Sequence, residues 1–142
     1  PGVYLLTSDG GLSSFQRRMR AIPKSVRNAV DPALLQGGYE IADAIEALAP
    51  EDEGDLKGSV AVTRGGKATP AYSAPGGTHV VPANQVAVTV GNTDVRYPHL
   101  VEYGTANAPA QPFFWPGFRL ARKKAENRIK RVMRKAIRDA KG

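Results

Sequence analysis

The chain has 142 residues, 42% of them hydrophobic and 23% charged, proportions typical of one globular domain with a core of its own. It contains no cysteine, which excludes disulfides, thiolate metal sites and cysteine nucleophiles. Its formal net charge is +7, so an anionic partner has to be considered. No apolar run approaches the roughly 20 residues that cross a bilayer, and no signal-peptide pattern is present. We therefore expect a single soluble, intracellular domain over residues 1–142.

The first third of the chain predicts an arm followed by helices. Residues 1–11 contain a short apolar run that ends at a glycine pair, and we interpret them as an N-terminal arm. Ser13 and Ser14 are candidate N-caps for a helix up to Ile22, which Pro23 would kink or end.

A longer helix is predicted over residues 25–49. Apolar positions recur there at steps of three and four residues, at Leu34, Gly38, Ile41, Ile45 and Leu48. We expect an interruption at Asp31-Pro32, because proline suits a first helical turn, and an end at Pro50.

Two strands are predicted over residues 57–64 and 85–91, where valine alternates with alanine and threonine. Residues 65–84 between them are rich in glycine and proline. Such a long connection is uncommon in a compact domain, so we expect an extended loop at the tip of a β-hairpin that orders against a neighbouring protein.

The last third predicts a turn, an aromatic segment and a helix. Residues 95–105 suit a short strand or a helical turn that Gly104 closes with a positive φ angle. The irregular segment that follows carries three phenylalanines and Trp115, which we expect to support folding rather than contact nucleic acid. Residues 117–142 predict a basic C-terminal helix with a thin alanine and isoleucine stripe. The expected fold class is α+β: a small antiparallel sheet packed against a long N-terminal helix and this basic helix, with the long hairpin loop.

Charge is distributed unevenly along the chain. Residues 117–142 contain eleven basic and two acidic residues, whereas residues 40–55 contain seven acidic residues and no basic one. Opposed charges of this kind can match unlike surfaces of neighbouring copies. The candidate contact residues for a subunit or a DNA channel are Arg119, Arg122, Lys123, Arg128, Arg131, Arg134, Lys135 and Arg138. The candidate acidic partner face is Glu40, Asp43, Glu46, Asp52 and Asp55.

Nothing in the sequence supports catalysis. His79 and His99 are the only histidines, and neither is paired with a nucleophile at a recognisable spacing. The carboxylates of residues 51–55 lack the ligand spacing of a calcium loop. We expect no enzyme activity, no metal, no cofactor and no small-molecule substrate.

Three motifs in order resemble a known family. The first runs from Pro50 to Val60 and includes Gly54, Leu56 and Ser59. The second, residues 97–105, includes Glu102, Tyr103, Gly104 and Thr105. The third is a Pro-Ala-Gln-Pro-Phe segment leading into the basic helix, and its positions include Pro112, Phe113 and Trp115. Together they resemble the neck or head–tail joining proteins of long-tailed bacteriophages, which include tail-completion and minor tail components.

The resemblance implies a structural virion protein. Such proteins are expected to form rings, commonly sixfold, that join the head connector to the tail tube and keep the DNA channel continuous. The implied partners are further copies of the chain, other connector and tail-tube proteins, and the DNA passing through. The implied location is the virion, and the host cytoplasm during assembly; no membrane is involved. The resemblance brings no catalytic residues, and we expect Glu102, Tyr103, Gly104 and Thr105 to form a buried structural turn.

The alternative is a nonspecific nucleic-acid-binding protein that uses the basic helix, since that helix lacks a recognition motif for base sequence. A phage-borne toxin or inhibitor finds no support in the sequence. Of the two possible partners of the basic helix, DNA or an acidic subunit surface, we favour the acidic block of an adjacent subunit.

Overall fold

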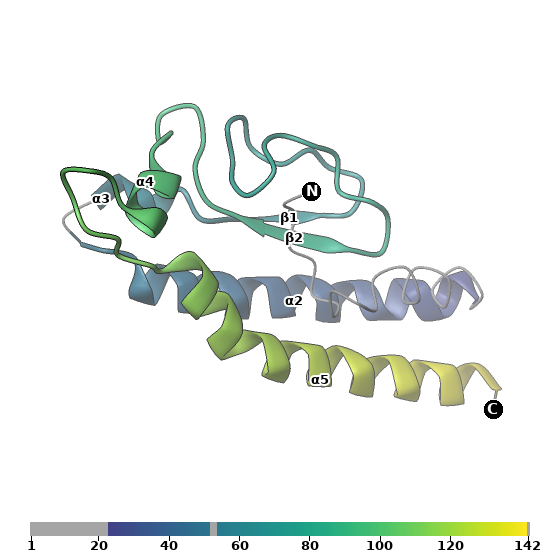
Figure 1. Cartoon of the computed structure of the whole chain (residues 1–142). Helices are drawn as coiled ribbons and strands as arrows, with labels where there is room; N and C mark the ends of the chain where they lie inside the picture. Colours follow the sequence, from purple (N-terminus) through teal and green to yellow (C-terminus); the bar gives the residue numbers. More distant parts are fainter. Residues whose placement is uncertain (1–22, 52–53, 142) are drawn as a thin grey trace.

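The computed structural model describes residues 23–51 and 54–141. The elements, in chain order, are α2 (Lys24–Leu48), α3 (Gly54–Gly58), β1 (Ala61–Arg64), β2 (Val86–Thr89), α4 (Pro98–Tyr103) and α5 (Phe114–Lys141). Figure 1 shows them in layers, with α2 between the sheet on one side and α5 on the other. The predicted α+β fold is confirmed. The predicted N-terminal arm and the helix up to Ile22 lie outside the described residues, as does Asp52.

Helix α2 is continuous where the sequence predicts an interruption. Pro32 lies inside it. Proline removes the hydrogen bond to the carbonyl four residues earlier, that of Asn28. Both Asn28 and Pro32 are exposed, so water can satisfy that carbonyl and the helix does not have to break there. The end is as predicted: Ala49 is extended, with φ −65° and ψ 135°, immediately before Pro50.

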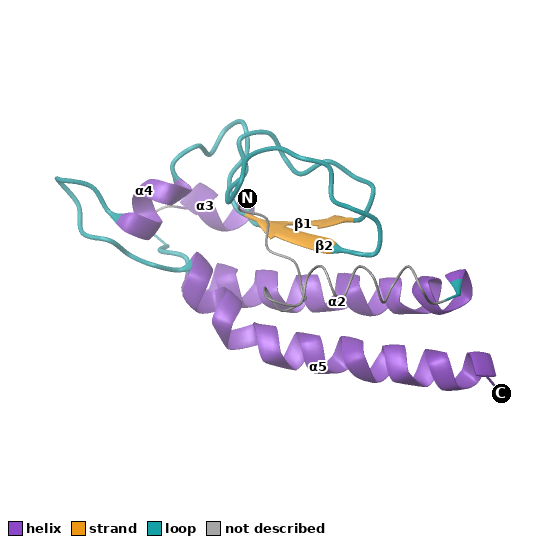
Figure 2. Cartoon of the chain, turned by 45° about the vertical axis from the view of Figure 1, so that its right-hand side comes forward, coloured by secondary structure: helices purple, strands orange, loops and turns teal. Residues whose placement is uncertain are grey.

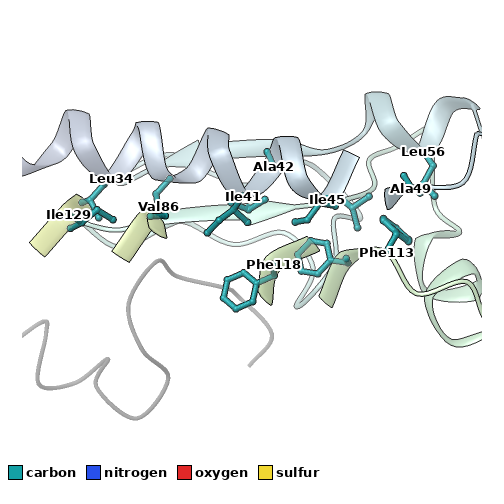
Figure 3. Packing of buried hydrophobic residues seen from close by; sticks show 14 of the residues in the cluster. Leu34, Ile41, Ala42, Ile45, Ala49, Leu56, Val86, Phe113, Phe118 and Ile129 are labelled. Atoms are coloured by element: carbon teal, nitrogen blue, oxygen red, sulfur yellow. The ribbon is translucent and has the colours of Figure 1, made fainter. Parts of the chain in front are cut away.

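The core lies along α2, which buries residues toward both the sheet and α5. Figure 3 shows Leu34, Ile41 and Ile45 of α2 among buried side chains from the neighbouring layers. Val86 comes from β2, and Phe118 and Ile129 come from α5. A helix covered on both sides needs apolar residues over most of its circumference, and α2 has buried side chains on either side of its principal stripe.

Two glycines allow the layers to approach closely. A Cβ atom on Gly38 would lie 2.8 Å from Val62 Cγ1 and 3.0 Å from Val86 Cγ2, so this helix position faces the sheet directly. On α5, a Cβ on Gly117 would lie 2.6 Å from the Cα atom of Ile45 and 2.8 Å from its nitrogen. The backbones of α2 and α5 therefore touch at this crossing.

We expect Gly117→Ala to lower the free energy of unfolding by about 1–3 kcal/mol, because the backbone of Ile45 cannot move aside as a flexible side chain can. This loss should appear although alanine favours a helix by about 1 kcal/mol over glycine. Urea denaturation followed by circular dichroism measures it. Gly58→Ala is the matched control, because no atom lies within 4 Å of its added Cβ. Equal stability of the two variants would contradict the close crossing.

The sheet is a two-stranded antiparallel hairpin in which Ala61 pairs with Thr89 and Arg64 with Val86. The predicted first strand, 57–64, starts too early. Lys57 and Gly58 belong to α3, because Ser59 closes a helical turn through its backbone N–H (3.1 Å) and its hydroxyl (2.7 Å), both donating to the carbonyl of Leu56. The second strand is also shorter than the predicted 85–91.

The long loop 65–84 folds back over the face of the sheet opposite α2 (Figures 1 and 2). Its two arms pair at Ala68 and Val80, and the chain returns to pair Ala74 with Val90. The residues of β2 are consequently buried on both faces. The hairpin prediction is correct and the loop packs on its own sheet, while its contact with a neighbouring protein stays a prediction.

Helix α4 occupies the segment predicted as a strand or helical turn, and Gly104 ends it with φ 77°, as expected. The expected burial of this turn is largely wrong. Glu102 is buried, but Tyr103 is 70% exposed and Thr105 is exposed as well. The reason is that the chain turns away from the body at Gly104 rather than toward the core.

Candidate functional site

A buried carboxylate joins the second and third motifs. Glu102 Oε1 accepts hydrogen bonds from the backbone N–H groups of Phe113 (3.1 Å) and Phe114 (2.9 Å), and Oε2 accepts one from Trp115 (3.4 Å). These N–H groups lie at the start of α5, where no carbonyl of the helix itself can accept them. A negative charge there also favours the positive end of the helix dipole. Glu102 is thus the N-terminal cap of α5.

The chain between α4 and α5 forms a fixed projection, residues 104–112, that stands off the body (Figure 2). At its base, the N–H of Gln111 donates to the carbonyl of Val101 (2.8 Å). A Cβ on Gly104 would lie 2.6 Å from the nitrogen of Ala110, so only glycine fits there. At its tip, Thr105 Oγ1 accepts the N–H groups of Asn107 (3.2 Å) and Ala108 (3.1 Å). The projection is therefore preorganised.

A small apolar pocket of about 190 Å³ lies at the base of the projection. Trp115 Nε1 donates to the hydroxyl of Tyr103 (3.0 Å) at its edge. The other residues that line the pocket come from the second and third motifs, from loop 65–84 and from the end of the sheet. They are Pro98, His99, Glu102, Phe113, Phe114, Ala74, Pro75 and Val90. Phe113, Phe114 and Phe118 are buried and Trp115 is half-buried, a placement that fits the expected role in folding.

The first motif also has a structural role. Leu56 is fully buried. The hydroxyl of Ser59 accepts the N–H of Gly91 (3.0 Å) while donating to the carbonyl of Leu56, so it ties α3 to the chain that follows β2. Gly54 begins α3. Leu56 and Ser59 therefore stabilise the fold, by burial and by these hydrogen bonds.

The basic residues of α5 form one exposed face on the outside of the layered molecule. Helices α2 and α5 run antiparallel, with Gly117 beside Ile45 and Arg128 beside Glu40, so the face of α5 opposite to α2 meets solvent (Figure 1). Eight of its basic residues are exposed: Arg119, Lys123, Lys124, Lys130, Arg131, Arg134, Lys135 and Arg138. We call this set the basic face.

Two other predicted contact residues form ion pairs within the chain. Arg128 pairs with Glu40 of α2 across the helix interface, with both side chains about three-quarters buried. Arg122 Nε lies 2.9 Å from Glu126 Oε1, one helical turn away. Arg128 and Glu40 therefore stabilise the packing of α5 on α2, a role that the sequence analysis did not assign to them.

The predicted acidic face draws on two helices, and Asp52 lies outside the described residues. Asp43 and Glu46 lie on α2 and Asp55 on α3, and Glu46 is half-buried. Beside them, Glu51 Oε1 lies 3.7 Å from the Nζ atom of Lys57. The basic residues therefore lie on one helix, whereas the described acidic ones lie on two.

Sequence reasoning missed four exposed apolar side chains on elements that meet at one end of the molecule. In the part of the chain that the structure describes, Leu48, Leu100, Tyr103 and Leu120 are large, apolar and exposed, Leu120 by 72%. They come from the end of α2, from α4 and from the start of α5, which lie together in Figure 1. We call them, with the projection, the apolar end. The available signal was Leu120, which falls opposite the alanine and isoleucine stripe of its helix.

Neither histidine is part of a reactive cluster. His79 Nδ1 donates to the carbonyl of Gly77 (2.8 Å), and His99 is exposed on α4. Among the described residues, no three histidine, aspartate or glutamate side chains are grouped as metal ligands. Within the same ranges, no helix combines the length and apolarity that a membrane span requires.

Comparison with known proteins places these features in a family. Curated proteins and solved structures gave no significant match. The family model HK97-gp10-like, which describes bacteriophage HK97-gp10 tail components, matches residues 13–104, well over half of the chain. That range contains the first motif and the second up to Gly104, and the third motif lies beyond its end. The chain therefore belongs to the HK97-gp10-like family of bacteriophage tail components.

Proposed function

We propose that this tail component acts at the phage neck or the top of the tail, where copies of it form a closed ring that joins the head connector to the tail tube. The role is head–tail joining, tail completion or tail termination. A sixfold ring is favoured, and it keeps the DNA channel continuous. The protein works as a structural part of the virion and not as an enzyme, and it assembles in the host cytoplasm with other connector and tail-tube proteins.

The observation that carries this proposal is the apolar end. Its projection is preorganised by the hydrogen bonds of Thr105 and Gln111, so docking it costs little conformational entropy. The projection, residues 104–112, carries no charged residue. Exposed apolar groups gathered in one region are typical of protein contacts, and head-to-tail contacts between unlike surfaces generate a ring when the rotation between copies closes. The motif residues Glu102 and Gly104 fix the geometry of this end and do not react.

We expect Leu120→Glu to convert the ring into monomers, because it places a charge in a contact that excludes water. Native mass spectrometry in the absence of DNA, with negative-stain microscopy, measures the assembly. Val80→Glu is the matched control, since Val80 is 65% exposed, pairs with Ala68 in loop 65–84, does not line the pocket at the base of the projection and undergoes the same change of charge.

Two results would contradict the proposal. A wild-type protein that stays monomeric at high concentration and is absent from rings in assembled particles would exclude the ring. Loss of the ring in the Val80 variant but not in the Leu120 variant would move the contact from the apolar end to the loop.

A further inference from the structure

We infer that the basic face of α5 binds the phosphate backbone of double-stranded DNA without reading its sequence. The inference deepens the proposed function and rests on it, because DNA passes through the channel of the proposed tail-top ring. It also replaces the preference for an acidic subunit surface that the sequence alone favoured.

The first support is the shape of the charged surface. The basic face extends from Arg119 to Arg138, which at 1.5 Å per residue is a straight span of about 28 Å. The only acidic residues of α5, Glu126 and Asp139, each pair with a residue one turn earlier in the same helix. Apart from Leu120 and Asn127, every exposed residue from Arg119 to Arg138 is therefore basic, as binding to a polyanion requires.

The second support is the balance of charge. In the described part of the acidic block, Glu40 pairs with Arg128, and the exposed carboxylates are those of Asp43, Glu51 and Asp55. Glu51 also lies near Lys57. The eight exposed basic residues of α5 outnumber the three exposed carboxylates of this described part. DNA, by contrast, presents one charge per 1.7 Å of axis, about 16 phosphates over the same 28 Å.

The third support concerns specificity. Apart from its basic residues, the outward side of α5 carries Asn127 and Leu120, and no residue pattern of a recognition helix. Phosphate contacts fix position without reading bases. Binding should therefore be equal for unrelated sequences.

The test is fluorescence polarisation with two unrelated 20-base-pair duplexes over a range of salt concentrations. The variant is Lys123→Gln/Arg134→Gln, at two exposed positions on the basic face. The matched control is Arg64→Gln/Lys67→Gln, which removes the same charge from exposed positions at the hairpin. Removing two phosphate contacts should lower the slope of log K against log salt by about 1.8, which corresponds to roughly 60-fold weaker binding at 0.1 M salt. The control should retain the wild-type slope.

Ring assembly is measured in parallel, by native mass spectrometry without DNA. Rings that are lost in the α5 variant while its DNA affinity is unchanged would overturn the inference in favour of an acidic neighbour, and the proposed function would stand. Equal weakening by both variants would also overturn it, since the affinity would then follow total charge. DNA binding through the basic face by a protein that never forms rings would support the inference and contradict the proposed function.

Discussion

Phe113→Ala is expected to lower the free energy of unfolding by about 3–5 kcal/mol. Phe113 is 0% exposed and is the largest of the fully buried side chains. Figure 3 shows it near Ala49 and Ile45 at the end of α2. Truncation removes the burial of the ring and leaves a cavity that the helices on either side cannot fill without moving.

Urea denaturation measures this loss, and Tyr39→Ala is its control. Tyr39 is an aromatic residue exposed on α2, so its truncation should change stability by less than about 0.5 kcal/mol. If Phe113→Ala does not fold, Phe113→Leu keeps most of the volume and should cost less than half as much. A Phe113→Ala protein within 1 kcal/mol of the wild type would contradict the described core.

Trp115→Ala should cost less than Phe113→Ala, although the sequence alone made Trp115 an equal candidate. Trp115 is half-buried and makes edge contacts with the rings of Phe114 (5.0 Å) and Phe118 (6.0 Å). Its indole N–H bonds to Tyr103, which is itself exposed. Part of the Trp115 side chain thus stays in contact with water in the native state, so its truncation removes less buried apolar surface than truncation of Phe113 does.

Glu102→Ala is expected to lower the free energy of unfolding by about 2–3 kcal/mol. The carboxylate accepts three N–H groups at the start of α5, two of them in a buried environment. Removing it leaves these donors without a partner away from water, and hydrogen bonds to a charged group contribute about 1.5–3 kcal/mol. Losing a helix cap adds to the cost. Glu102→Gln keeps one acceptor oxygen and should lose about half as much.

Denaturation and amide hydrogen exchange distinguish this cap from a general charge effect. The N–H groups of Phe113 and Phe114 should exchange faster in Glu102→Ala than in the wild type. Asp43→Ala is the control, because it removes the same charge from an exposed position on α2. Unchanged exchange at Phe113 and Phe114 would show that the cap does not hold the helix start.

The cap also links folding to the proposed assembly. Glu102 fixes both the start of α5, which carries Leu120, and the base of the projection, which begins at Gly104. Both belong to the apolar end. A protein weakened at Glu102 should therefore lose ring assembly at temperatures where its remaining helices are still folded.

The sequence by itself determined the elements whose signal is local. Steps of three and four residues predicted α2 and α5, and alternating valines predicted the two strands. The positive φ of Gly104 and the end of α2 at Pro50 followed from the backbone chemistry of glycine and proline. The motifs led to the phage tail family, which the family model confirms over residues 13–104.

Only the tertiary structure decided what covers each face. Glu102 is 11 residues from Phe113, Glu40 pairs with Arg128 on another helix, and Ser59 binds Gly91 across the sheet. Local periodicity shows that a face is apolar or charged, but it carries no information on which distant segment will meet it. The same limit applies to loop 65–84, whose composition predicts a long connection and not the sheet on which it lies. These contacts depend on how the layers assemble, so they are set by the three-dimensional packing of α2 between the sheet and α5.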